Sequence, residues 1–151
     1  IPKNLRAEMS DWVFGCDICQ DVCPVNVSTL YSSEQAFKKK RFTTLELLEI
    51  LSLTQGEFQL RFAKSPIKRA KLEGLKRNAC VALGNSGDRS AVPALAKILQ
   101  YGTPLERAHA AWALGELGGE KAVAALKQTM VLDEEDMVLA EVSAAIDLLS
   151  V

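Results

Sequence analysis

Residues 79–87 read ACVALGNSG and residues 110–118 read AAWALGELG, so one stretch of the chain recurs after 31 residues. The alanine, leucine and glycine positions coincide in the two copies. The match continues downstream, where residues 91–95 (AVPAL) correspond to residues 122–126 (AVAAL). Each unit is therefore predicted to be a helix, a glycine-containing turn and a second helix.

A unit of this length, with small residues on its facing sides, predicts an α-solenoid, because one helical hairpin must stack on the next to bury its apolar face. The pattern resembles short HEAT-like repeats. We expect residues 85–88 to form the turn between two repeat helices and Trp112 to lie in the core. A last helix is expected over residues 134–149, with acidic residues at its N-terminus. The predicted repeat domain covers residues 65–151.

Two shorter helices are expected before the repeats, so the fold class is mainly α. Apolar residues between Thr43 and Leu53 follow helical spacing behind a Thr N-cap, with Glu46 in the first turn. Apolar and polar residues alternate over residues 55–64, and we interpret that stretch as a helix rather than an extended connector. Residues 41–64 are thus predicted to form a helical connector.

Three of the four cysteines lie near the start of the chain, in a segment with little helical periodicity. Their spacing, Cys16-x2-Cys19-x3-Cys23-Pro24, matches the last three positions of the run C-x2-C-x2-C-x3-C-P that binds iron–sulfur clusters in bacterial ferredoxins. Val13 stands at the first position, so one ligand must come from elsewhere. We interpret residues 1–40 as the tail of a ferredoxin-like 4Fe–4S module, with Cys16, Cys19 and Cys23 as metal ligands.

Other chemistry remains open for these thiols. They could hold a zinc ion with a fourth ligand, or Cys16 and Cys19 could act as a redox pair. A disulfide framework is disfavoured, because nothing indicates secretion. The single histidine, His109, falls inside a predicted repeat helix and is expected to be a surface or packing residue. Cys80 lies on the small-residue face of a repeat helix and is expected to be a buried packing thiol.

Charge is distributed unevenly along the 151 residues. Hydrophobic residues make up 48% and charged residues 25%, which suits a protein with a core, and the formal net charge of −1 argues against a generally basic nucleic-acid binder. The net charge is nevertheless −3 over residues 1–34, +7 over residues 35–89 and −5 over residues 90–151. The central block indicates either a local polyanion site or an ordinary solvated helix face.

Six cations of this block are the candidate nucleic-acid-binding residues: Lys64, Lys68, Arg69, Lys71, Lys76 and Arg77. Helical spacing is expected to place Lys64, Lys68 and Lys71 on one side. The run Lys38–Arg41 could contribute in the same way. The chain opens on Ile1, shows no signal-peptide pattern and has no apolar run long enough for a membrane helix, so we expect a cytoplasmic piece of a longer product.

Three blocks of sequence, FGCDICQDVCP (14–24), SPIKRAK (65–71), and RN (77–78) with LGNSGD (83–88), resemble in order and spacing the C-terminal part of epoxyqueuosine reductase. The resemblance implies an oxidoreductase that reduces epoxyqueuosine in tRNA to queuosine with cobalamin and two [4Fe–4S] clusters. It also implies that Cys16 and Cys19 ligate the second cluster and Cys23 the first. Val25 departs from the family, which usually has Trp after Cys-Pro.

The same resemblance places the cobalamin-binding domain and the catalytic acid upstream, so no catalytic residue is assigned here. It implies that electrons come from a donor of unknown identity and that the basic residues contact tRNA phosphates. Two alternatives remain: a non-catalytic HEAT-like interaction module with a structural metal site, and an iron–sulfur electron-transfer protein.

Overall fold

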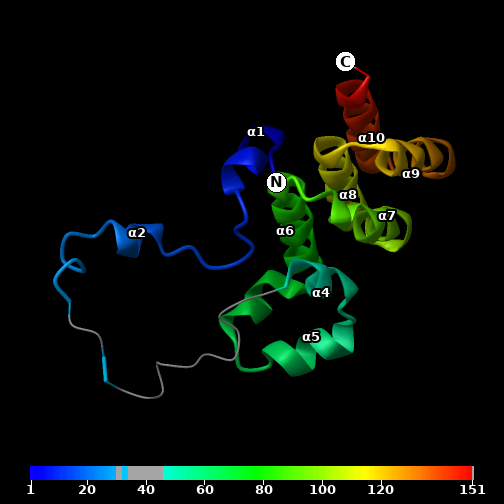
Figure 1. The fold of residues 1–151 in the computed structure, drawn as a ribbon. Helices are drawn as coiled ribbons and strands as arrows, with labels where there is room; N and C mark the ends of the chain where they lie inside the picture. Colours follow the sequence, from blue (N-terminus) through cyan, green and yellow to red (C-terminus); the bar gives the residue numbers. More distant parts are fainter. Residues whose placement is uncertain (30–31, 34–45, 151) are drawn as a thin grey trace.

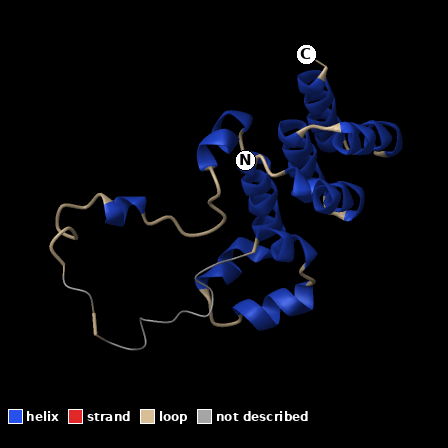
Figure 2. Cartoon of the chain, in the orientation of Figure 1, coloured by secondary structure: helices blue, strands red, loops and turns tan. Residues whose placement is uncertain are grey.

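The computed structural model describes residues 1–29, 32–33 and 46–150, and every regular element in these ranges is a helix (Figures 1 and 2). None of these helices is long and apolar enough to span a membrane. In chain order the elements are α1 (Lys3–Arg6), η1 (Ala7–Met9), α2 (Ile18–Asp21), α4 (Leu47–Ser52), α5 (Gln55–Phe62), η2 (Pro66–Ala70), α6 (Lys71–Ser86), η3 (Arg89–Ala91), α7 (Val92–Tyr101), α8 (Pro104–Leu117), α9 (Glu120–Leu132) and α10 (Asp136–Leu149).

The predicted repeats are confirmed as two helical hairpins, α6 with α7 and α8 with α9, followed by α10 (Figure 1). Helix α8 lies at the centre, where it packs against α6, α7 and α10. The last helix begins at Asp136 rather than at Glu134, because Glu135 has an extended backbone and takes the N-cap position. The helix predicted over residues 55–64 is α5. The earlier helix is α4, which begins at Leu47; residues 43–45 of the predicted range lie outside the described residues.

Local signals set the ends of the repeat helices. The side chain of Thr103 accepts a hydrogen bond from the backbone of Glu106, whose carboxylate accepts one from the backbone of Thr103, so that a capping box starts α8. Gly87 follows α6 and Gly118 follows α8, with φ of 69° and 63°. These left-handed values are easily adopted by glycine, which ends each helix and turns the chain towards the next.

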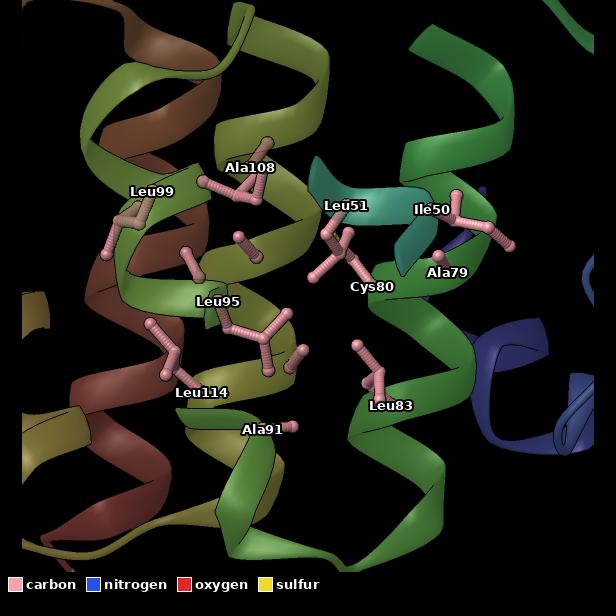
Figure 3. Close-up of a cluster of buried hydrophobic side chains, with 14 of the residues drawn as sticks. Ile50, Leu51, Ala79, Cys80, Leu83, Ala91, Leu95, Leu99, Ala108 and Leu114 are labelled. Atoms are coloured by element: carbon pink, nitrogen blue, oxygen red, sulfur yellow. The ribbon is translucent and has the colours of Figure 1, made fainter. Parts of the chain in front are cut away.

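The core consists mainly of leucines and alanines, with isoleucines, valines and two phenylalanines, between closely packed helices (Figure 3). Close packing depends on two glycines at equivalent repeat positions. A Cβ atom on Gly84 would lie 2.9 Å from the Trp112 ring, and one on Gly115 would lie 2.8 Å from the Ala145 Cβ. The shared glycine therefore lets α6 approach α8, and lets α8 approach α10.

Candidate metal and nucleic-acid sites

The three predicted ligand cysteines lie in and around α2, which stands apart from the repeat helices in Figure 1. Cys16 and Cys19 are exposed, Cys23 is half-buried, and all three are free thiols. Within the described ranges, no three His, Cys, Asp or Glu side chains are arranged so that they could hold a metal ion. The structure therefore does not bring the three thiols together as a ligand set.

The residues around these thiols agree in kind with a cluster site. Thiolates are the usual ligands of [4Fe–4S] clusters, and the spacing of the cysteines is that of a ferredoxin run. Apolar side chains next to them are strongly exposed, namely Ile18 at 49%, Val22 at 70% and Val25 at 78%. Such side chains can shield a cluster from water once other parts cover them, so the chemistry of the donors suits this group although their arrangement here does not form a site.

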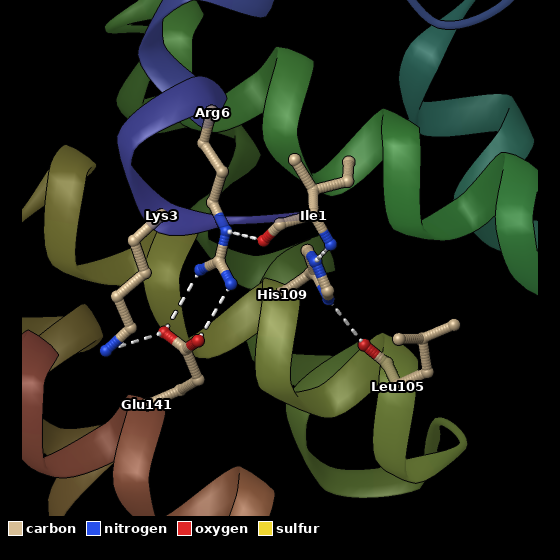
Figure 4. A network of polar contacts seen from close by, with 6 residues as sticks. All are labelled: Ile1, Lys3, Arg6, Leu105, His109 and Glu141. Carbon is tan, nitrogen blue, oxygen red and sulfur yellow. Dashed lines mark hydrogen bonds and ion pairs between the residues drawn. The ribbon is translucent and has the colours of Figure 1, made fainter.

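Residues before the cysteines are held against the repeats by a buried arginine (Figure 4). The Arg6 side chain is 4% exposed, and its Nη1 and Nη2 atoms donate to the two carboxylate oxygens of Glu141 in α10 at 3.0 and 2.7 Å. The guanidinium also lies 5.5 Å from the centre of the Trp112 ring. Burial acts to raise the pKa of Glu141, but the hydrogen bonds and charge of Arg6 outweigh it and lower that pKa.

Two asparagines of α6 hold the same N-terminal segment by its backbone. The Nδ2 atom of Asn78 donates to the Val13 carbonyl at 2.7 Å, and Nδ2 of Asn85 donates to the Arg6 and Ser10 carbonyls, both at 2.8 Å. The predicted turn over residues 85–88 begins later than expected, because α6 extends to Ser86. Asn85 belongs to the last turn of α6, because only Gly87 takes the left-handed conformation that ends the helix.

Sequence reasoning missed these anchors. The seven-residue spacing of Asn78 and Asn85 places both on one face of a helix, and this signal was available. The pairing of Arg6 with Glu141 had no such signal, since 135 residues separate them.

The six predicted nucleic-acid-binding cations lie around the start of the first repeat. Lys64 follows α5, Lys68 and Arg69 are in η2, and the other three are in α6. Lys76 and Arg77 are half-buried and the other four are exposed. None of the six forms an ion pair with any residue that the structure describes. Their positive charge is thus not neutralised by a neighbouring carboxylate of those ranges.

Helical spacing does not unite these cations, and the expectation that Lys64, Lys68 and Lys71 share one side of a helix is wrong. The short helix η2, which begins at Pro66, separates α5 from α6. Lys71 then adopts φ of 57° and ψ of 165°, a conformation that is costly for a residue with a side chain. The chain changes direction there, so a helical period cannot run from residue 64 to residue 71.

The three other residues considered from the sequence are packing residues. His109 is 3% exposed, with its Nδ1 atom 2.9 Å from the Leu105 carbonyl, and burial lowers its pKa to about 4. Cys80 is fully buried, and burial raises the pKa of its thiol. Trp112 is half-buried against the core and beneath Arg6. The sequence-based interpretation of His109 and Cys80 is confirmed, whereas Trp112, expected in the core, packs against its edge with part of its surface exposed.

Comparisons with known proteins agree with this architecture. Residues 68–147 match the family of HEAT repeats. The epoxyqueuosine reductase of Bacillus cereus is 28% identical over 152 residues, which cover 99% of this chain and 40% of that protein. A crystal structure of epoxyqueuosine reductase with a tRNA-Tyr epoxyqueuosine-modified tRNA stem loop has a TM-score of 0.91 at 26% identity, over 99% of this chain and 40% of the other. The Streptococcus thermophilus enzyme has a TM-score of 0.83 at 28% identity, with the same coverage.

The chain spans about 40% of the length of these epoxyqueuosine reductases, and the similarity runs through both the cysteine segment and the repeats. The resemblance inferred from the sequence is thereby confirmed. The match to HEAT repeats extends over more than half of the chain and includes α6 to α10 almost entirely. The chain therefore belongs to the HEAT-repeat family.

Proposed function

We propose that this chain acts as part of an epoxyqueuosine reductase, in which it supplies cluster ligands and a tRNA-binding helical-repeat arm. The similarity over 99% of the chain to such an enzyme, in a structure with a modified tRNA stem loop, is the observation that carries the proposal. The reaction is the reduction of epoxyqueuosine to queuosine in tRNA. It draws on cobalamin and two [4Fe–4S] clusters, and on an electron donor that remains to be identified.

The cysteine segment would contribute thiolates to both clusters. Cys16 and Cys19 would ligate the second cluster, while Cys23, which precedes Pro24, would ligate the first. Bound clusters supply one-electron transfer towards the corrinoid. This chain's own part is to keep the thiolates at fixed positions and to limit the access of water through Ile18, Val22 and their neighbours. Residues 1–40, 41–64 and 65–151 would then serve as ligand segment, connector and arm.

The repeat arm would bind tRNA through the cations at its start. Lys64, Lys68, Arg69 and Lys71 are exposed. Exposed cations that pair with no carboxylate of the described ranges can neutralise phosphates and release counterions, which gives affinity and orientation but no sequence information. Lys76 and Arg77 follow in α6 and are half-buried.

The test uses the full-length product of the gene, purified without oxygen and supplied with cobalamin, a reductant and tRNA that carries epoxyqueuosine. Mass spectrometry of the digested nucleosides should show the loss of one oxygen and the appearance of queuosine. A protein that carries both clusters and cobalamin but converts nothing would contradict the substrate assignment. Stoichiometric zinc without iron and sulfide would instead favour an interaction module with a structural metal site.

A further inference from the structure

We propose that Asn78 and Asn85 are positioning residues: from one face of α6 they fix the path of the backbone that leads into Cys16. The inference rests on the proposed function in one respect, namely that the thiolates are cluster ligands. The contacts themselves link the first repeat helix to residues 6–13, a segment that sequence patterns do not connect with it.

The amide nitrogens of the two asparagines donate to backbone carbonyls of the N-terminal segment. Asn85 uses its amide nitrogen for two carbonyls, those of Arg6 and Ser10, both at 2.8 Å. Asn78 donates to the Val13 carbonyl at 2.7 Å. The Arg6 and Ser10 carbonyls lie at the ends of the short helices α1 and η1, where carbonyls need partners from outside the helix. The Val13 carbonyl lies in the loop that follows.

Asn78 is suited to its place for a second reason. Its Oδ1 atom accepts two hydrogen bonds from the Arg77 guanidinium, from Nε at 3.0 Å and from Nη2 at 2.9 Å. The guanidinium offers only donors and the Val13 carbonyl only an acceptor, so a side chain between them must present both kinds of atom. An amide does so, whereas a carboxylate would satisfy Arg77 and repel Val13.

The contact at Val13 limits where the first thiol can be. Cys16 is the third residue after Val13, and an extended chain of three residues spans at most about 10 Å. The Asn85 contacts hold the segment two helical turns away along α6, about 10 Å from Asn78. Two fixed points on a rigid helix therefore define both the position and the direction from which the cysteine segment starts.

Arg6 adds a third contact, from a different helix. Its buried pairing with Glu141 ties the same segment to α10, so the backbone is held from both ends of the row α6, α8 and α10. Because Asn78 and Asn85 contact the segment through its main-chain carbonyls, they set its path whatever side chains it carries.

The test compares Asn78→Asp and Asn85→Asp in the full-length gene product, reconstituted anaerobically with iron and sulfide. Each change keeps the size of the side chain but turns an acceptor towards a carbonyl. Amide hydrogen exchange over residues 6–14 should rise at least about fivefold for the single bond of Asn78, and further for the two bonds of Asn85. Exchange in α8 should stay unchanged. The electron paramagnetic resonance spectrum of the reduced clusters should change as well.

Asn4→Asp is the matched control, because Asn4 is an exposed amide in α1 and the change adds the same charge. It should leave both measurements at their wild-type values. Wild-type exchange in Asn78→Asp and Asn85→Asp would overturn the proposal, and so would faster local exchange with unchanged cluster spectra. Faster exchange throughout α8 would reduce both residues to a general structural role. A protein that binds no iron, yet exchanges faster over residues 6–14 in these variants, would uphold the positioning contacts while contradicting the cluster proposal.

Discussion

The repeats and the cysteine segment are built on opposite principles. In the repeats, Leu95, Leu114 and Leu126 are completely buried, and each helix packs on its neighbours. In the cysteine segment, Val22, Val25 and Val27 are 70–81% exposed, and α2 has four residues. The repeats are thus stabilised by their own core, whereas the cysteine segment depends on anchors from the repeats and on whatever covers its apolar side chains.

Removing a core side chain should have the largest effect. Leu114→Ala leaves a cavity in the central helix α8 and should lower the free energy of unfolding by about 2–5 kcal/mol. Urea denaturation measures the loss. Leu60→Ala is the control, because Leu60 is 83% exposed and little is lost by truncating it. Equal effects of the two changes would show that the repeats do not have the core described here.

The second-largest effect is expected from adding a methyl group where two repeat helices approach closely. Gly115→Ala places a Cβ atom 2.8 Å from that of Ala145 and should cost about 1–3 kcal/mol of stability through overpacking. Gly56→Ala serves as the control in α5, where a Cβ atom would meet nothing within 4 Å. The control should keep or slightly raise the melting temperature, and a fall as large as that of Gly115→Ala would contradict the packing argument.

The proposed role of the cations at the start of the repeats can be tested by charge reversal. Lys68→Glu combined with Arg69→Glu should weaken binding of an epoxyqueuosine-modified tRNA stem loop at least about tenfold and reduce the salt dependence of the affinity. Fluorescence anisotropy at several salt concentrations measures both. Lys121→Glu with Lys127→Glu, exposed cations of α9, is the control with the same change of charge. Equal losses from both pairs would indicate that only net charge matters.

Acid should weaken the repeats through His109. Its pKa falls from 6.5 to about 4 in the folded protein, because burial penalises the charged ring. The unfolded chain therefore binds more protons between these values, so stability is lost as the pH falls from about 6.5 towards 4, by on the order of 1 kcal/mol. Unfolding at pH 5 and pH 7.5 measures the difference. His109→Gln should reduce it, and an unchanged slope would assign the acid sensitivity to other groups.

How much could be predicted from the sequence differs between the regions for a physical reason. The repeats follow from local patterns, because the 31-residue period and the glycine after each first helix report packing that recurs. The anchors of the cysteine segment depend on contacts between residues far apart, such as Arg6 and Glu141, which leave no period. The cysteine spacing indicated the kind of ligand, yet a fourth ligand and a convergent arrangement are tertiary properties.

The prediction that Lys64, Lys68 and Lys71 share one side of a helix was wrong for a related reason. Helical spacing assumes one continuous helix, and Pro66 together with the left-handed backbone of Lys71 interrupts it. The helix break at a proline can be predicted from the sequence. The positive φ of a lysine cannot, because its side chain does not favour that conformation.

The paired glycines also distinguish α10 from the two repeat helices before it. Gly84 and Gly115 each make a notch in one helix for the backbone of the next, and the whole of α10 contains no glycine. A partner that lies against the outer side of α10 must stand off by at least a methyl group, unlike α8 on α6 or α10 on α8. Helix α10 therefore has two unlike faces: one meets the glycine of α8 at close range, and the other has no glycine that would admit a further helix at the same distance.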